Sequence, residues 1–133
     1  MGSKFIIKIA SLKDIHKVYT LRKNTIDNNE FDSVSYKSFW EWLFINNPKS
    51  LFYVLLGENK NEIIGQAGLY PVDFNLKGEK LTGGFLCELM VRSDFRKTLL
   101  FFNIENKIIN TYKSKGFDFI YGLINKKKVL NAH

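Results

Sequence analysis

The apolar residues of the first fifty positions follow two different periods. Residues 5–9 form a β-branched run that predicts a strand, and Ser11 with Asp14 has the spacing of a capping box that opens a helix. The apolar residues that follow recur every three or four positions, which predicts a helix with one apolar face. A second helix is expected from about residue 35 to 45, because two asparagines and a proline at 46–48 end it.

The middle of the chain changes to the pattern of strands. Residues 51–56, 62–72 and 80–91 are largely apolar, and polar or glycine-containing turns separate them. The connections are too short for a crossover helix, so the three segments are expected to form an antiparallel meander. Gly65 and Gly68 suggest a bulge or a bend in the second of these strands.

The last third returns to helical spacing before a final strand. An apolar stripe predicts a helix from residue 99 to 115, with Gly116 as its C-cap. Residues 117–121 predict another strand, and Asn125 begins a further helix. The order strand–helix–helix–strand–strand–strand–helix–strand–helix indicates an α/β (α+β) fold with a mixed, largely antiparallel sheet, in a single domain over residues 1–133.

The composition is typical of a folded globular chain. Of the 133 residues, 45% are hydrophobic and 25% are charged, and 12 Phe, 6 Tyr and 2 Trp supply enough bulk for a core. The single cysteine, Cys87, excludes an internal disulfide, and with only two histidines no metal site is expected. No apolar run approaches the roughly 18 residues of a membrane span, and no secretion signal is recognisable, so we expect a cytoplasmic protein without a membrane partner.

The formal net charge of +7 is concentrated near the C-terminus. Residues 92–133 hold nine basic and three acidic side chains, whereas residues 1–91 are nearly balanced. A one-sided positive field attracts phosphate on a nucleic acid or on a small cofactor, or it only keeps the domain soluble. The chain has no recognised nucleic-acid motif, so a nucleic-acid partner is not expected.

The segment most indicative of chemistry is residues 83–96, a predicted strand and loop that lead directly into a helix. The free N–H groups at the start of a helix, together with its dipole, form a site for phosphate or pyrophosphate. Arg96 and Lys97 add positive charge at the same place. The sequence therefore predicts a phosphate-bearing ligand here.

In this segment the chain resembles the GNAT superfamily of acyl-CoA-dependent N-acyltransferases. Residues 91–96, Val-Arg-Ser-Asp-Phe-Arg, are similar to the first half of the family pattern Val-x-Pro-x-Tyr-Arg-Gly-x-Gly-x-Gly/Ala. Residues 116–122 and Asn125 look like the next strand of the family and the asparagine that follows it. Residues 64–68 and Pro71 resemble members found among bacterial polysaccharide and amino-sugar acyltransferases.

The resemblance implies acetyl-CoA as co-substrate and a small amine or amino sugar as acceptor, with direct attack in a ternary complex and no metal. The Leu89 amide would face the thioester carbonyl, and Glu88 would remove a proton from the acceptor. Trp40 and Phe44, in the second helix, would contact the acceptor. The residues implied in binding the co-substrate are Leu89, Val91, Arg96, Lys97, Thr98, Leu99, Leu100, Phe101 and Asn125.

Several of these residues have a purely structural alternative. Strict alternation along the strand places Glu88 on the opposite face from Cys87 and Leu89, where it would point to solvent or pair with a lysine. Trp40 and Phe44 would otherwise pack in the core, and Cys87 is expected to be a small core residue.

The sequence also departs from the family pattern. Lys97, Leu99 and Phe101 stand where the family has glycines, against which a pyrophosphate rests. The sequence ends at His133, before two further strands of the family, so the fold is expected to be C-terminally truncated. Strand 117–122 would then be an exposed edge, and we expect a homodimer to cover it. These departures support a second hypothesis, a catalytically silent interaction module.

Overall fold

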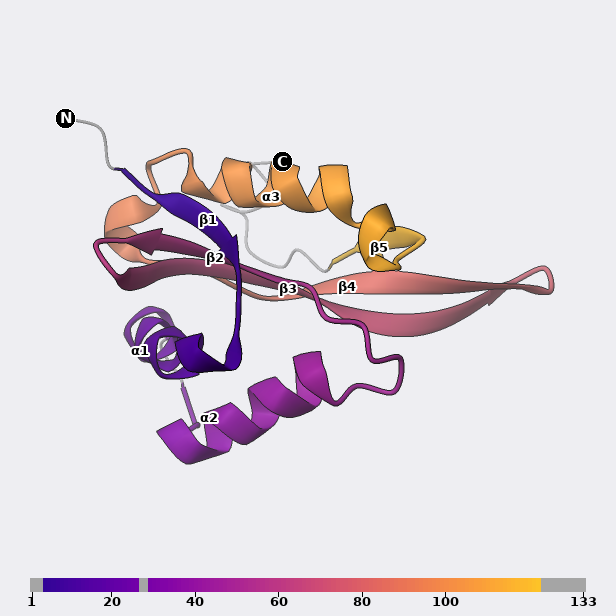
Figure 1. Ribbon diagram of the computed structural model, residues 1–133, viewed down its shortest axis with the longest axis horizontal. Helices are drawn as coiled ribbons and strands as arrows, with labels where there is room; N and C mark the ends of the chain where they lie inside the picture. Colours follow the sequence, from indigo (N-terminus) through magenta and orange to yellow (C-terminus); the bar gives the residue numbers. More distant parts are fainter. Residues whose placement is uncertain (1–3, 27–28, 123–133) are drawn as a thin grey trace.

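The computed structural model describes residues 4–26 and 29–122, which form a five-stranded sheet between two layers of helices (Figure 1). The strands are β1 (Ile6–Ile9), β2 (Val54–Asn59), β3 (Glu62–Leu76), β4 (Glu79–Val91) and β5 (Phe119–Tyr121). The α-helices are α1 (Ile15–Thr25), α2 (Ser33–Trp40) and α3 (Leu100–Thr111). The strands lie in sequence order, and neighbours are antiparallel except β4 and β5, which are parallel. The predicted mixed sheet is confirmed.

The helices cover the two faces of the sheet, as Figure 1 shows. α1 and α2 lie against one face, and their core includes Val18, Tyr36, Trp40 and Phe44, none of which has exposed surface. α3 lies against the other face, where the fully buried Leu100 is part of a second core. Because both faces are covered, the central strands read as nearly continuous apolar runs in the sequence.

Local side chains determine where the first two helices begin. The Ser11 N–H donates to Asp14 Oδ2 at 3.0 Å, so the predicted capping box is present, and a 3-10 turn, η1 (Leu12–Asp14), leads into α1. At the start of α2, Asp32 Oδ1 accepts the Ser35 N–H at 2.7 Å. Both helices therefore begin within a few residues of the predicted positions.

The second helix continues as a π-turn, η2 (Glu41–Ile45), and so occupies the predicted range. Asn47 ends it, because its side-chain amide donates to carbonyls of this turn and, at 2.8 Å, to the Leu51 carbonyl. β2 then begins at Val54 rather than at residue 51.

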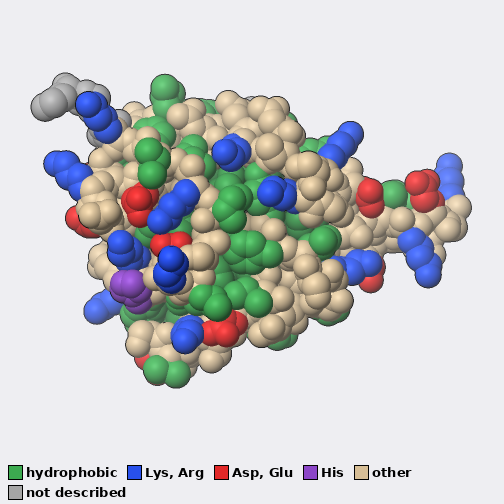
Figure 2. Space-filling view, viewed as in Figure 1, with side chains coloured by type: hydrophobic (Ala, Val, Ile, Leu, Met, Phe, Trp, Pro, Cys, Tyr) green, Lys and Arg blue, Asp and Glu red, His purple; other side chains and the backbone are tan. Residues whose placement is uncertain are grey.

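β3 and β4 form a long hairpin that extends well beyond the body of the molecule (Figure 1). Its turn contains Gly78 in the left-handed conformation, with φ 85°. The exposed tip carries charges of both signs, from Lys77, Glu79 and Lys80 (Figure 2). The hairpin is longer than predicted at both strands, since β3 reaches Leu76.

The helix predicted over residues 99–115 and the strand predicted over residues 117–121 are present but shorter. α3 is followed by a 3-10 turn, η4 (Lys113–Lys115), and Gly116 ends it with φ 100°, as expected of a C-cap glycine. β5 has three residues, beginning at Phe119 rather than at residue 117. The helix predicted to begin at Asn125 lies outside the described residues.

The aromatic side chains around β5 are covered within the chain. Phe117 is only 1% exposed, and the Phe119 ring packs on Phe74 of the hairpin, with 4.9 Å between ring centroids. Tyr121 packs on Phe74 and Phe85 at 5.5 and 5.3 Å. β5 is the edge strand of the described sheet, as predicted, but the aromatic side chains on it and beside it are not bare: Phe117 is buried, and Phe119 and Tyr121 are half-buried against the long hairpin.

Candidate active site

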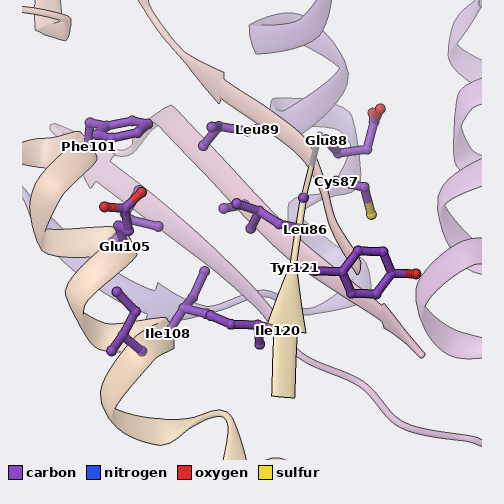
Figure 3. Close-up of a pocket in the computed structure, with 13 residues that line it drawn as sticks. Leu86, Cys87, Glu88, Leu89, Phe101, Glu105, Ile108, Ile120 and Tyr121 are labelled. Carbon is purple, nitrogen blue, oxygen red and sulfur yellow. The ribbon is translucent and has the colours of Figure 1, made fainter. Parts of the chain in front are cut away.

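The candidate site begins where β4 and β5 separate. The two strands pair only over Gly83–Phe85 and Phe119–Tyr121. Beyond Phe85, β4 continues to Val91 and pairs only with β3 among the described strands. A groove of about 450 Å³ opens at this point, between β4, β5 and α3 (Figure 3).

The wall of the groove next to α3 is mostly apolar. Leu86 and Leu89 come from β4, Ile120 from β5, and Phe101, Ile104 and Ile108 from α3, which also contributes the Glu105 carboxylate. Figure 3 shows Leu86 and Leu89 on the α3 side of β4, with the Cys87 and Glu88 side chains on the other side. Such walls suit a long, flexible ligand arm that is mostly apolar.

A β-bulge in β4 lies at the mouth of the groove. Gly68 pairs with Cys87 and Gln66 with Met90, so Glu88 and Leu89 together oppose the single residue between Gly68 and Gln66. Glu88 has φ 53°, in the left-handed region. The bulge breaks strict alternation, so Cys87 and Glu88 share one face; the expectation that Glu88 lies opposite Cys87 is wrong.

The strand at and after the bulge has two backbone donors that point away from β3. The Arg92 N–H donates to the Ile64 carbonyl of β3 at 2.8 Å, and successive N–H groups of a regular strand point to opposite sides, so the Val91 N–H points away from β3. Leu89 lies within the bulge, where its N–H points opposite to the Glu88 carbonyl of the same peptide, which accepts Gln66 Nε2 of β3 at 3.1 Å. Consistently, the Val91 carbonyl faces the same side and accepts Arg96 Nε at 3.0 Å.

The Glu88 carboxylate lies on the α1–α2 side and is held by one residue from each helix. Arg22 Nη1 and the Tyr36 hydroxyl donate to Glu88 Oε1 at 2.6 and 2.9 Å. The Arg22 guanidinium also lies over the Phe31 and Tyr36 rings, 5.1 and 5.3 Å from their centroids. Burial and the negative charge of Glu88 raise the pKa of Tyr36, so its hydroxyl stays a hydrogen-bond donor.

Cys87, on the same face as Glu88, is a protonated thiol. Burial, and next the nearby charge of Glu88, raise the pKa of Cys87 to about 12. The thiolate is the nucleophilic form of cysteine, so this environment opposes nucleophilic catalysis.

The loop from β4 to α3 brings together the residues predicted to hold a diphosphate. Arg96 and Lys97 are exposed there, and Thr98 Oγ1 accepts the Leu100 N–H at 3.2 Å. The Leu99 side chain is 66% exposed, so it does not fill the space in front of the helix start. Asn125, the remaining predicted ligand residue, lies outside the described residues.

The predicted acceptor residues lie elsewhere. Trp40 and Phe44 have no exposed surface and pack against each other in the core, with ring centroids 5.3 Å apart. This burial corrects the prediction that they contact an acceptor. The neighbouring Trp42 is 56% exposed and stacks on Tyr70, with ring centroids 5.9 Å apart.

Three residues of the site are not apparent from the sequence. Arg22 and Tyr36 are 66 and 52 residues away from Glu88, and Gln66 is buried among apolar residues of β3. The polar character of Gln66 within an apolar strand is the one sequence signal that could have indicated it, because a buried amide requires partners. The carboxylate partners carry no local signal.

Two further properties concern only the part of the chain that the structure describes. No group of three or more His, Cys, Asp or Glu side chains there is arranged to hold a metal ion. No helix in residues 4–26 or 29–122 is long and apolar enough to cross a membrane.

The fold is similar to that of solved acetyltransferases. A predicted acetyltransferase from Clostridium acetobutylicum, solved with acetyl-CoA, has a TM-score of 0.76 at 18% identity, covering 97% of this chain and 88% of that one. A glucosamine-6-phosphate N-acetyltransferase from Arabidopsis thaliana has a TM-score of 0.73 at 14% identity, covering 98% and 88%. An aminoglycoside N-acetyltransferase in complex with CoA has a TM-score of 0.75 at 14% identity, covering 99% and 84%.

The sequence shows the family of the chain, which the fold alone does not. The model of the acetyltransferase (GNAT) family matches residues 12–125, and the chain therefore belongs to this family. This confirms the resemblance seen in the sequence, although the match does not distinguish the amino-sugar subgroup. A comparison with curated proteins found no match.

Proposed function

We propose that this domain transfers an acetyl group from acetyl-CoA to a primary amine. The proposal depends on one observation: the groove opens where β4 leaves β5, and the bulge at its mouth directs the Leu89 N–H away from β3. In this arrangement the thioester carbonyl would lie beside that N–H, and the diphosphate would lie beside the start of α3.

Separate parts of the site would bind separate parts of the co-substrate. The mostly apolar wall of the groove suits the acetylated pantetheine arm, and the Val91 N–H, which points away from β3, would bond one of its amides. The loop from Lys97 to Phe101 and the charges of Arg96 and Lys97 would hold the diphosphate, and the Thr98 and Leu100 N–H groups would have to exchange their present partners, the Phe95 carbonyl and Thr98 Oγ1, to take part. Asn125 is proposed to bond the arm.

The chemistry proposed is direct attack in a ternary complex. The neutral amine forms a C–N bond at the thioester carbonyl carbon, and negative charge develops on the carbonyl oxygen. Donation from the Leu89 N–H stabilises this oxyanion. The C–S bond then breaks, and the CoA thiolate leaves. The nitrogen, which is cationic after the attack, loses one proton to give the neutral amide, and the thiolate takes up a proton to give the CoA thiol.

Glu88 is our proposed proton acceptor for the acceptor ammonium. Arg22 and Tyr36 both bind Oε1, so proton transfer would use Oε2, directly or through one water. The side chain is 16% exposed, which leaves it within reach of solvent on the α1–α2 side.

An amino sugar is our proposed acceptor among primary amines. The exposed ring of Trp42, stacked on Tyr70, offers a flat apolar surface to a sugar ring. A relative with the same fold is a glucosamine-6-phosphate N-acetyltransferase. Small amines and peptide amines are the competing acceptors, and the assay below separates them.

Calorimetry with acetyl-CoA, followed by an assay of thiol release, tests the proposal. We expect saturable binding with a dissociation constant on the order of micromolar, equivalent to roughly 8 kcal/mol of binding free energy. Release of the CoA thiol should then depend on an added amine, and fastest release with glucosamine would support the amino-sugar assignment. A folded protein that gives no binding heat would instead be a silent interaction module.

A further inference from the structure

We propose that Gln66 is a positioning residue that aims and polarises the Leu89 N–H by holding the other end of the same peptide unit. This inference rests on the proposed function, in which that N–H stabilises the oxyanion. Gln66 lies on β3 with no exposed surface. Its side chain connects the bulge to α2, through Glu88 and Trp40.

The hydrogen-bond partners determine which way the Gln66 amide faces. Trp40 Nε1 lies 2.9 Å from Gln66 Oε1, and an indole N–H only donates, so the amide oxygen must be the atom that faces Trp40. The amide nitrogen, Nε2, then faces the Glu88 carbonyl oxygen at 3.1 Å and donates to it. A donor chain therefore runs from Trp40 through Gln66 to the Glu88 carbonyl.

The Glu88 carbonyl and the Leu89 N–H belong to one planar peptide unit. In a trans peptide these two groups point in opposite directions, so fixing the carbonyl also fixes the N–H. Gln66 holds the carbonyl on the β3 side, which sends the Leu89 N–H toward the groove. A hydrogen bond accepted by the carbonyl also polarises the unit, which makes its N–H a better donor.

The backbone at the bulge depends on such support. Glu88 has φ 53°, a left-handed conformation that a non-glycine residue adopts only where its surroundings hold it. Arg22 and Tyr36 hold the Glu88 carboxylate, but a side chain can turn about its own bonds without turning the peptide. Gln66 is the described side chain that binds the peptide itself.

The test replaces Gln66 with methionine, which keeps the length of the side chain and removes both polar groups. Tyr53→Phe is the matched control, because it also deletes a buried polar group, one that bonds Thr111 Oγ1 on the α3 face. Each variant is examined by acetyl-CoA calorimetry, by amine-dependent thiol release, and by the amide NMR resonance of Leu89 in isotope-labelled protein.

For Gln66→Met we expect kcat to fall by about 10- to 100-fold, approaching the loss of one oxyanion donor. The acetyl-CoA dissociation constant should stay within about threefold, because groove and helix start are unchanged. The Leu89 amide resonance should move, whereas Tyr53→Phe leaves both kcat and that resonance near the native values. A variant whose kcat and Leu89 resonance match those of the control overturns the inference.

If Gln66→Met does not fold, Trp40→Phe is the second variant. It removes the donor that orients the Gln66 amide and, because Trp40 is fully buried, also some core volume. We expect a smaller loss of kcat with a shifted Leu89 resonance in the folded variant; native values of both would contradict us. If the native protein neither binds nor turns over acetyl-CoA, the proposed function fails. The positioning role is then judged by the Leu89 resonance alone.

Discussion

At the scale of single residues, the site depends on a carboxylate whose two oxygens differ. Glu88 Oε1 accepts hydrogen bonds from Arg22 of α1 and Tyr36 of α2, which connects the bulge to both helices. A hydrogen-bonded charge pair that is mostly buried fixes geometry, and removing its charge tests whether it also takes part in the reaction.

Glu88→Gln is the substitution that separates these roles. The amide oxygen still accepts from Arg22 and Tyr36, but the side chain no longer accepts a proton, so we expect kcat to fall by about 100-fold at unchanged acetyl-CoA affinity. Thiol release and calorimetry measure the two quantities. Asp73→Asn, which removes the exposed ion pair with Lys49, serves as control. Native kcat in Glu88→Gln would show that the carboxylate only anchors the bulge.

The raised pKa of Cys87 leads to a prediction about its reactivity. At about pH 8 a thiol with a pKa of about 12 has roughly a thousandth of the thiolate of an ordinary cysteine. We expect alkylation by iodoacetamide to be slower by about that factor than in the unfolded chain. Because the pKa is raised on folding, the thiol contributes stability that is lost as pH rises from about 9 toward 12. Rapid alkylation of the folded protein would contradict this environment.

At the scale of elements, the sequence predicted the strands and helices and a bulge in β3, which is present next to Gly65 in the pairing with β2, but not the bulge in β4. The apolar runs gave β2, β3 and β4, and the capping box gave the first helix, because these are properties of neighbouring residues. The bulge in β4 arises from a left-handed Glu88, a residue type that gives no backbone signal of its own. Arg22 and Tyr36, the partners of the Glu88 side chain, could not be predicted either, because they come from distant segments of the chain.

The packing of η2 on β3 gives a prediction at this scale. A Cβ on Gly68 would lie 2.5 Å from two ring atoms of Phe44, which is fully buried. Gly68→Ala should therefore lower the free energy of unfolding by about 1–3 kcal/mol, the usual cost of overpacking. Gly122→Ala, whose Cβ would come no closer than 3.4 Å to Leu86, should change it by less than about 0.5 kcal/mol. Urea denaturation compares them; equal stability of both variants would contradict the packing described.

At the scale of the whole molecule, the sequence predicted one mixed sheet with helices on it, and the structure confirms this arrangement. The prediction failed for the acceptor side, where Trp40 and Phe44 proved to be core residues. Several aromatic residues in one helix are consistent with either a core or a binding surface, and only their neighbours in space decide between the two.

A homodimer stays a prediction at this scale, and so does a cytoplasmic location. The aromatic residues of β5 pack on Phe74 and Phe85 within the chain, but β5 is the last strand of the described sheet, so its outer edge is where a second copy would pair. Sedimentation equilibrium at increasing concentration tests it. Twice the chain mass is the predicted result, and a single chain of 15.5 kDa at every concentration would contradict it.

The most direct test of the central claim is an amide NMR titration of the native protein with acetyl-CoA. We predict that the Leu89 and Val91 N–H resonances move most among the β4 amides, because Leu89 lines the groove and the Val91 N–H points away from β3. Titration with CoA, which lacks the thioester carbonyl, should still move Val91 but move Leu89 much less. Acetyl-CoA binding that leaves the Leu89 resonance in place would contradict the assignment of this N–H as the oxyanion donor.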